Sequence, residues 1–220
     1  VVSSFETAHV SPYVETRYGC AISNVMLTEA DDLENILAPI DPYVDYILLD
    51  SGSVEVAHPS PQNAQVLQYD DVTVWARATV THLTQLLDNS LKDKTILLLG
   101  DPQLCETASN LLKSLGAETT TGHTLGPIDI DSVVALSPRT AVVDEALIDS
   151  LANPTLIFDA GIGSLSPDAI HAADQAGHRL VRIDFRPTLS ATALELINMK
   201  NIVEKQMGRG EWDGVPVVAG

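Results

Sequence analysis

The feature that most constrains the fold is the alternation of short apolar runs and helical segments in the second half of the chain. Its first unit begins with the apolar run Ile96–Leu99, turns at Gly100 and continues with leucines at helical spacing as far as Gly116. An apolar run, a glycine turn and an amphipathic segment predict a buried strand followed by a helix. We therefore expect a strand at 95–100 and a helix at 102–115.

The same alternation extends towards residue 206. We expect further strands at 117–121, 132–136, 154–159 and 179–184, and further helices at 142–151, 166–176 and 189–206. Strict alternation of this kind is typical of a parallel, doubly wound α/β sheet with right-handed crossovers. The run at 117–121 is half polar, so we expect it towards an edge of the sheet.

A smaller α/β lobe is expected ahead of this sheet. Apolar runs at 20–27 and 44–50 predict two strands, and Thr28 is expected to cap a short helix between them. Apolar residues at helical spacing then predict a long connecting helix at about 72–90. We therefore expect two domains, a small N-terminal lobe at 1–71 and a larger domain at 72–220 that includes the connecting helix.

The composition excludes several classes of partner. The chain of 220 residues has 30 acidic and 12 basic side chains, a net charge of −18, which repels nucleic acid and anionic membranes. The two cysteines, Cys20 and Cys105, form no CxxC pair, and neither a signal pattern nor a membrane-spanning apolar run occurs. We expect an acidic, cytoplasmic protein that acts on a small molecule.

Three motifs stand in this order of elements: KTILLLG from Lys94 to Gly100, SLGAE from Ser114 to Glu118, and LIFDAG from Leu156 to Gly161. Over about residues 72–200 the pattern resembles the cofactor domain of Rossmann-fold NAD(P)-dependent dehydrogenases of the amino-acid, shikimate and methylene-tetrahydropterin type. The resemblance implies a Rossmann-like, mostly parallel sheet, an NAD(P) cofactor and an oxidoreductase that acts on a small metabolite. By the same analogy, and from the apolar residues at 215–219, we expect a homodimer.

The phosphate-binding turn departs from that family. A dinucleotide fingerprint is G-x-G-x-x-G, whereas this chain has Gly-Asp-Pro-Gln-Leu-Cys and keeps only the first glycine, Gly100. Pro102 suits a first helical position but lacks an amide hydrogen. Asp101 is expected at the N-cap, where it would repel a phosphate ~4 Å away by about 4 kcal/mol at a dielectric constant of 20. Gly100, Asp101, Pro102 and Gln103 are candidate cofactor-binding residues, with a plain helix cap as the alternative for Asp101.

Further cofactor-binding candidates follow the other strands, because ligands of open α/β sheets bind outside the carboxyl ends of the strands. They are Thr121, His123, Ser137, Pro138, Asp159, Gly161 and Gly163. The second strand ends without the carboxylate that normally holds the ribose of NAD, which favours NADP. The alternative is a threonine-rich edge strand without a ligand.

Two aspartates are candidate catalytic residues. Asp50 ends an apolar strand before a glycine turn, a position that faces a cleft in such folds and suits a general base. Asp184 ends the last predicted strand, although its pairing with Arg186 could equally fix the start of the next helix. We find no metal-binding motif.

Two other functions remain open. An S-adenosylmethionine-dependent methyltransferase could use the same sheet, and its cofactor carries cationic groups and no phosphate, so Asp101 would not oppose it. A non-catalytic Rossmann-like module for assembly or regulation would explain the eroded fingerprint. We favour the oxidoreductase because an unrelated protein is less able to reproduce the whole order of strands and helices than a dehydrogenase is to vary the one loop that binds phosphate.

Overall fold

The structure is a computed structural model that describes residues 9–17, 19–26, 32–51, 61–122, 129–137, 140–161, 163–202 and 209–218. The chain divides into two compact units. One comprises Val1–Asp71 with Leu189–Gly220, and the other comprises Val72–Thr188. The domains predicted from sequence are 1–71 and 72–220, whereas this division places Leu189–Gly220 with the first unit.

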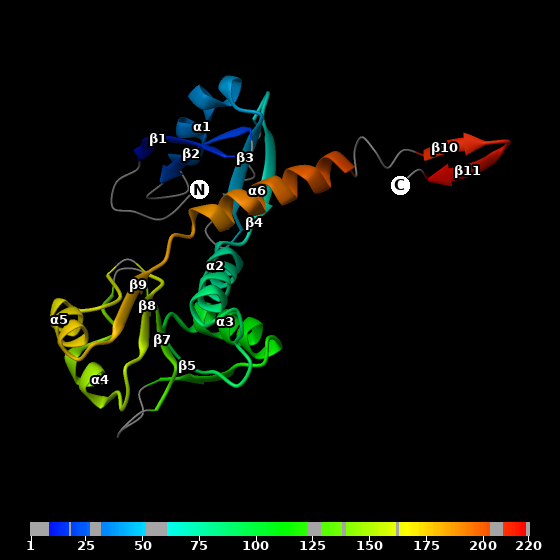
Figure 1. The fold of residues 1–220 in the computed structure, drawn as a ribbon. Coiled ribbons are helices and arrows are strands. Elements are labelled where there is room, and N and C mark those ends of the chain that lie inside the picture. The colour runs from blue at the N-terminus through cyan, green and yellow to red at the C-terminus, as the bar shows by residue number, and fades with distance from the viewer. Residues whose placement is uncertain are drawn as a thin grey trace. The chain divides into compact units, whose positions relative to one another are not determined.

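The second unit is built on a five-stranded parallel sheet (Figure 1). Its strands are β5 (Thr95–Gly100), β6 (Glu118–Thr121), β7 (Ser132–Leu136), β8 (Leu156–Asp159) and β9 (Arg179–Arg182). Their order across the sheet is β6-β5-β7-β8-β9. The chain therefore runs outwards from β5 to the edge strand β6, returns past β5 to β7, and continues to the opposite edge. Both the parallel sheet and the edge position of the half-polar strand were predicted, and both are confirmed.

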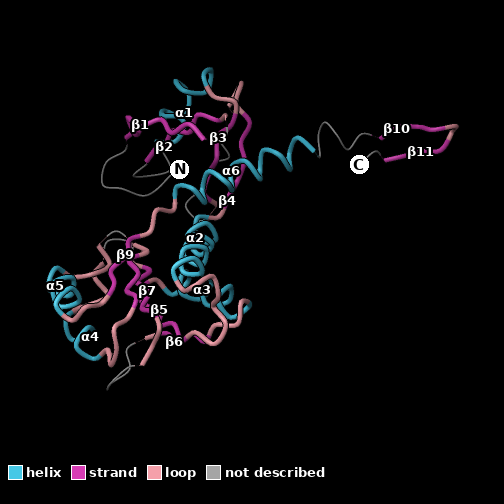
Figure 2. The backbone as a smooth tube through the Cα atoms, in the orientation of Figure 1, coloured by secondary structure: helices cyan, strands magenta, loops and turns pink. Residues whose placement is uncertain are grey.

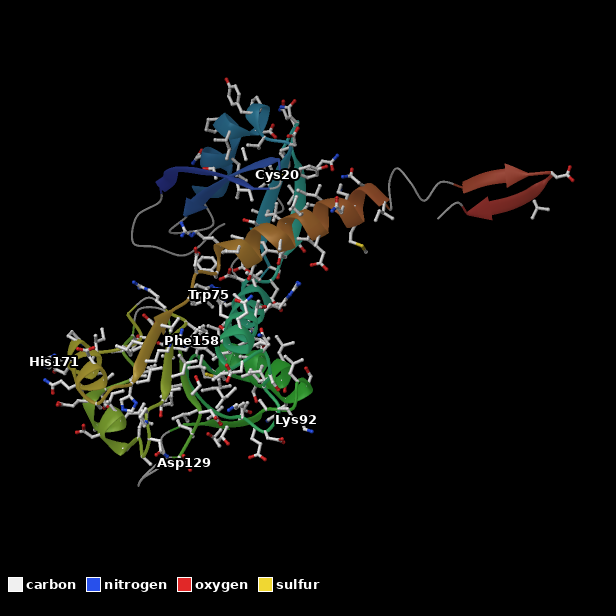
Figure 3. The ribbon with its side chains drawn as sticks, viewed as in Figure 1. Cys20, Trp75, Lys92, Asp129, Phe158 and His171 are labelled. Carbon is white, nitrogen blue, oxygen red and sulfur yellow. The ribbon has the colours of Figure 1, made fainter. Side chains whose placement is uncertain are left out.

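Helices cover both faces of this sheet. They are α2 (Asp71–Leu86), α3 (Pro102–Ser114), α4 (Glu145–Ser150) and α5 (Pro167–Gln175). Helices α2 and α3 lie on one face and α4 and α5 on the other (Figure 2). Successive strand residues point to opposite faces. Phe158 therefore packs with α2 and α3 (Figure 3), whereas Ile157 packs with α4 and α5. The doubly wound architecture predicted from the alternation is confirmed.

Short polar side chains define where three of these helices begin. The side chains of Asp101, Asp144 and Ser166 each accept the backbone N–H three residues further on, at 2.9, 2.9 and 3.1 Å. Each side chain thereby satisfies an N–H that has no partner within its helix. Pro102 and Pro167 occupy the next position, where a missing N–H is harmless.

Within Val1–Asp71, the described residues of the first unit form two pairs of strands. Strand β1 (His9–Arg17) pairs antiparallel with β2 (Cys20–Met26), and β3 (Tyr46–Asp50) pairs parallel with β4 (Gln65–Tyr69). Helix α1 (Asp32–Ile40) and the 3-10 turn η1 (Asp41–Tyr43) precede β3. The strands β2 and β3 and the short helix were predicted from sequence, whereas β1 and β4 were not. Thr28, the expected cap, lies outside the described residues.

Asp41 fixes the chain ahead of β4. Its buried carboxylate accepts the amides of Gln62, Asn63 and Ala64 at 3.0, 3.1 and 2.7 Å. These hydrogen bonds, led by that of Ala64, hold the pKa of Asp41 below its ordinary value. The polar segment around residue 63 is therefore ordered by a distant carboxylate rather than by its own periodicity.

The last elements are α6 (Arg186–Asn201) and a hairpin of β10 (Arg209–Trp212) and β11 (Val215–Val218). Helix α6 begins before the predicted residue 189, because the Asp184 carboxylate accepts the Arg186 amide at 3.1 Å and ends the extended segment. No described helix is long and apolar enough to cross a membrane.

Candidate functional site

The chain reverses its direction across the sheet between β5 and β7, and their carboxyl ends form the centre of the candidate site. Gly100 ends β5 with a φ of +130° and is exposed. A Cβ at this position would overlap the carbonyl of Leu136 at the end of β7. The Asp101 amide donates to that same carbonyl at 2.8 Å. Only glycine fits this close approach, which presents backbone at the point where ligands of doubly wound sheets bind.

Asp101 is the N-cap of α3, with an extended backbone and its carboxylate on the Leu104 amide. Pro102 follows and has no amide hydrogen. Gln103 comes next and is exposed. Within the first turn of α3, the Gln103 amide is therefore the donor that could bind a phosphate oxygen without displacing the Asp101 side chain from the N-cap.

Cys105 stands where the dinucleotide fingerprint has its last glycine. Its side chain is buried in the core between the sheet, α2 and α3. Burial, with a smaller contribution from Asp101, raises the pKa of the thiol to about 11. The thiol is thus protonated at neutral pH and fills the space between helix and sheet rather than acting as a nucleophile.

A second glycine approaches the end of β7 from the opposite side. Gly161 is buried, and a Cβ there would overlap the carbonyl of Ser137 and the hydroxyl of Ser164. The Ser164 hydroxyl donates to the Ser137 carbonyl at 2.8 Å. Gly163, by contrast, has a φ of +80°, and none of the residues that the structure describes comes within 4 Å of a Cβ built there. Glycines therefore flank the end of β7 on both sides, through β5 and through the loop after β8.

Charged side chains lie at the carboxyl ends of β8 and β9. Asp159 and Arg182 are register partners, and Arg182 Nε lies 3.7 Å from Asp159 Oδ2. Arg186 Nε and Nη2 each donate to the Asp184 carboxylate at 2.8 Å. Both pairs are partly exposed, so their Coulomb energies are small. Asp184 thus holds Arg186 at the start of α6, which is the structural role expected as the alternative to a catalytic one.

Asp50 belongs to the N-terminal unit. It ends β3, is buried, and accepts the amide of Asp71 at 3.1 Å. Its register partner on β4 is Tyr69, whose phenol pKa is raised by burial and then by Asp71 and Asp50. The carboxyl ends of β3 and β4 therefore bring together two carboxylates and a buried phenol.

The remaining candidates are Thr121, His123 and Pro138. Thr121 is exposed at the end of β6, while Thr119 on the same strand shares a 2.7 Å hydrogen bond with Ser109 of α3. His123 and Pro138 lie outside the described residues. Of the candidates from sequence, Gly100 to Gln103, Ser137 and the loop 159–163 thus share the carboxyl ends of three neighbouring strands.

Sequence reasoning missed three contributors to this edge of the sheet. They are Ser164, Arg182 and the stacked pair of Trp75 and Phe185, whose ring centroids are 4.3 Å apart. Trp75 is visible in the sequence as part of an apolar helical face, but its partner comes from a loop about a hundred positions away. Among the described residues, no group of three or more His, Cys, Asp or Glu side chains could hold a metal ion.

These elements define a doubly wound, Rossmann-like α/β domain. No family model and no curated protein matches the sequence. Among solved structures, the chain is similar to a dipicolinate synthase from Bacillus halodurans, at 14% identity over 71% of this chain and 79% of that chain, with a TM-score of 0.41.

Two further structures are similar at the same level. One is a dipicolinate synthase from Bacillus subtilis, at 16% identity over 64% of this chain, with a TM-score of 0.42; this chain spans 60% of its length. The other is NAD-dependent formate dehydrogenase from Staphylococcus aureus in complex with NAD, at 12% identity over 89% of this chain and 88% of that chain, with a TM-score of 0.43. We therefore argue function from the residues of this chain.

Proposed function

We propose that this protein binds NAD(P) across the carboxyl ends of β5, β7 and β8 and acts as an oxidoreductase on a small metabolite, of the amino-acid, shikimate or methylene-tetrahydropterin dehydrogenase type. The observation that carries the proposal is Gly100, an exposed glycine with positive φ where the chain reverses across the sheet. When bound, NAD(P) supplies the hydride acceptor or donor.

The residues at this edge fit the cofactor in part. Gly100 lets backbone approach a ligand closely, and the Gln103 amide can donate to one phosphate oxygen. Within the described part of the chain, no atom crowds Gly163 in the loop after β8. Asp101 opposes a phosphate, so a diphosphate would lie to one side of the N-cap rather than on it.

The end of β6 supports NADP over NAD. The described residues from Thr119 to Gly122 carry hydroxyls and no carboxylate. A carboxylate there would hold the ribose hydroxyls of NAD and repel a 2′-phosphate. We therefore propose NADP as the preferred form.

For proton transfer, Asp50 and Asp184 remain our candidates. Asp184 follows β9 at the same edge as the proposed cofactor site, and its carboxylate is partly exposed. An Asp184→Asn variant separates the two roles. Loss of kcat with unchanged melting supports catalysis, whereas a lower melting temperature with unchanged kcat assigns Asp184 to the start of α6.

A methyltransferase is the second candidate, and Asp101 is the observation that favours it. An exposed carboxylate at the N-terminus of α3 repels phosphates but attracts the sulfonium and ammonium groups of S-adenosylmethionine. A non-catalytic assembly or regulatory module is the remaining alternative.

Thermal shift with NADH, NADPH, S-adenosylmethionine and S-adenosylhomocysteine separates these functions. A ligand at 100 times its dissociation constant stabilises by about 2.7 kcal/mol. We expect stabilisation by NADPH most strongly. Stabilisation by S-adenosylmethionine and S-adenosylhomocysteine alone would establish the methyltransferase. A melting temperature unchanged by all four compounds would favour the non-catalytic module.

An Asp101→Ser variant tests the charge argument. Serine keeps the cap and removes the carboxylate, so the Kd for NADPH should fall at least about tenfold, or 1.4 kcal/mol. Asp144→Ser makes the same change at the cap of α4 and serves as the control. If both variants bind NADPH as the wild type does, Asp101 does not face the phosphates.

We also propose a cytoplasmic homodimer. Cys20 and Cys105 are free, as expected of a reducing compartment. The net charge of −18 argues against nucleic acid or an anionic membrane as partner.

A further inference from the structure

We propose that the carboxyl ends of β3 and β4 form a ligand site in the first unit. In this site the Tyr69 hydroxyl donates a hydrogen bond to an alcohol group of an uncharged small molecule, and the Asp50 carboxylate accepts a hydrogen bond from the same group. The proposal goes beyond the oxidoreductase and does not rest on cofactor binding, because every residue in it belongs to Val1–Asp71.

Asp50 and Tyr69 are the last residues of two paired strands. They are register partners in the parallel pair of β3 and β4, so their side chains lie on the same face of that pair. Leu49, the residue before Asp50, packs with Leu37 of α1 in an apolar cluster on the other face. Asp50 and Tyr69 therefore share a face that is separate from this apolar cluster.

Backbone amides fix this corner of the unit. The Ser51 amide donates to the Tyr69 carbonyl at 2.7 Å, and the Asp71 amide donates to Asp50 Oδ1 at 3.1 Å. Ser51 is exposed and Asp71 is partly exposed, whereas Asp50 and Tyr69 are buried. Solvent therefore borders the pair through the residues that are bonded to it. A ligand enters from there by displacing the side chains that cover the Tyr69 hydroxyl.

The Tyr69 hydroxyl is the observation that points to a ligand. Tyr69 is 4% exposed, and among the described residues its buried hydroxyl oxygen has no hydrogen-bond partner. Burial, followed by the charges of Asp71 and Asp50, raises the pKa of the phenol, so the hydroxyl keeps its proton beside the two carboxylates. Nearly all buried polar groups in native proteins are paired. A bound acceptor would pair this one.

The two carboxylates decide which acceptor fits. An anion is repelled by Asp50 and Asp71. An ammonium group is attracted, but it has no lone pair with which to accept a hydrogen bond from Tyr69. A metal ion would need further ligands, since no group of three or more His, Cys, Asp or Glu side chains in the described part of the chain could hold one. An alcohol oxygen accepts from Tyr69, and its hydrogen reaches Asp50, whose carboxylate offers about four acceptor positions.

Saturation-transfer NMR on the full chain compares these ligand classes. The probes are glycerol and myo-inositol as uncharged alcohols, acetate as an anion and ethylamine as a cation. We expect an alcohol to bind, and its Kd should rise at least about tenfold in Tyr69→Phe, which removes the donor and keeps the ring. Asp50→Asn should also weaken binding, because an amide oxygen accepts less strongly than a carboxylate. Tyr46→Phe is the matched control, since Tyr46 lies at the opposite end of β3 and the Kd should stay unchanged.

Thermal melting without a probe tests the unpaired hydroxyl directly. Removing a hydroxyl that has a partner in the folded protein lowers stability, whereas removing an unpaired one does not. The melting temperature of Tyr69→Phe should therefore equal or exceed that of the wild type. Circular dichroism verifies that each variant is folded.

Several results would overturn the proposal. They are a lower melting temperature for Tyr69→Phe, no binding of either alcohol, a preference for acetate or ethylamine, and equal affinity of the wild type and Tyr69→Phe for the alcohol. A rise in melting temperature with Mg²⁺ or Ca²⁺ that Asp50→Asn abolishes would assign the site to a cation instead. Thermal shift with NADPH on the same samples reports the proposed cofactor site separately, so a failure there does not bear on this site.

Discussion

Replacing Gly100 by alanine should destabilise the second unit far more than a similar change nearby. The backbone at Gly100 has a φ of +130°, and a Cβ there would overlap the Leu136 carbonyl. A positive φ costs a non-glycine residue about 1–2 kcal/mol, and forcing two packed strands apart adds about 1–3 kcal/mol. We expect a loss of about 2–5 kcal/mol in the free energy of unfolding.

Gly163→Ala is the control for the cost of a positive φ alone. Gly163 also has a positive φ, at +80°, but no atom of the described residues lies within 4 Å of its missing Cβ. Its replacement should cost only about 1–2 kcal/mol. The difference between the two variants therefore measures the close approach of β5 and β7.

Urea unfolding followed by tryptophan fluorescence makes the comparison. The chain has two tryptophans, so a Trp212→Phe background leaves Trp75, which stacks on Phe185 within the second unit. Equal losses for the two glycine variants would refute the claim that the end of β5 lies against the carbonyl of β7.

Three further predictions concern contacts that hold the same unit together. Ser164→Ala leaves the buried Ser137 carbonyl unpaired and should cost about 1–3 kcal/mol in urea unfolding, whereas Ser114→Ala, at an exposed hydroxyl, should stay within about 0.5 kcal/mol. Burial lowers the pKa of His178, whose Nδ1 accepts a backbone amide at 3.0 Å, so the neutral form is favoured in the fold. The stabilisation of the fold by neutral His178 is present above the ordinary pKa of about 6.5 and is lost as the pH falls. The urea concentration at the unfolding midpoint should therefore be lower at pH 5.5 than at pH 7 in the wild type, and this difference should be smaller in His178→Ala. Burial raises the pKa of Asp131, but hydrogen bonds from Lys94 and the Thr95 amide outweigh it and hold the pKa below its ordinary value. Asp131→Asn should cost about 1 kcal/mol at pH 7, and the difference from the wild type should shrink as the pH falls below about 4.

The strands and helices from 95 to 182 could be predicted because local signals agree with the fold. Each buried strand is an apolar run, and each helix begins at an Asp or Ser cap. The edge position of β6 follows from its threonines, since only an edge tolerates so polar a strand.

The strands of the N-terminal unit could be predicted only in part. Strand β1 contains Pro12, and its register with β2 shifts between Val10 and Val14, so no regular period marks it. Strand β4 is ordered by β3 and by Asp41, both far away in sequence. Pairing partners of this kind leave no local pattern.

For the site, the sequence shows which residues follow the strands but not what they touch. Gly100 is visible as a glycine after an apolar run, and Asp101 as a cap before proline. The need for glycine at 161 depends on Ser137 and Ser164, which only the assembled sheet brings against it. Asp159 and Arg182 likewise meet through strand register rather than through spacing.

The most direct test of the proposed site is amide hydrogen exchange of the full chain with and without NADPH. Binding at the carboxyl ends of β5, β7 and β8 should slow exchange at residues 100–105, 136–137 and 160–163. The amides of α5 at 170–175 should remain unchanged. NADPH binding without protection at 100–105, or no NADPH-dependent protection at all, would contradict a nucleotide site beside Gly100.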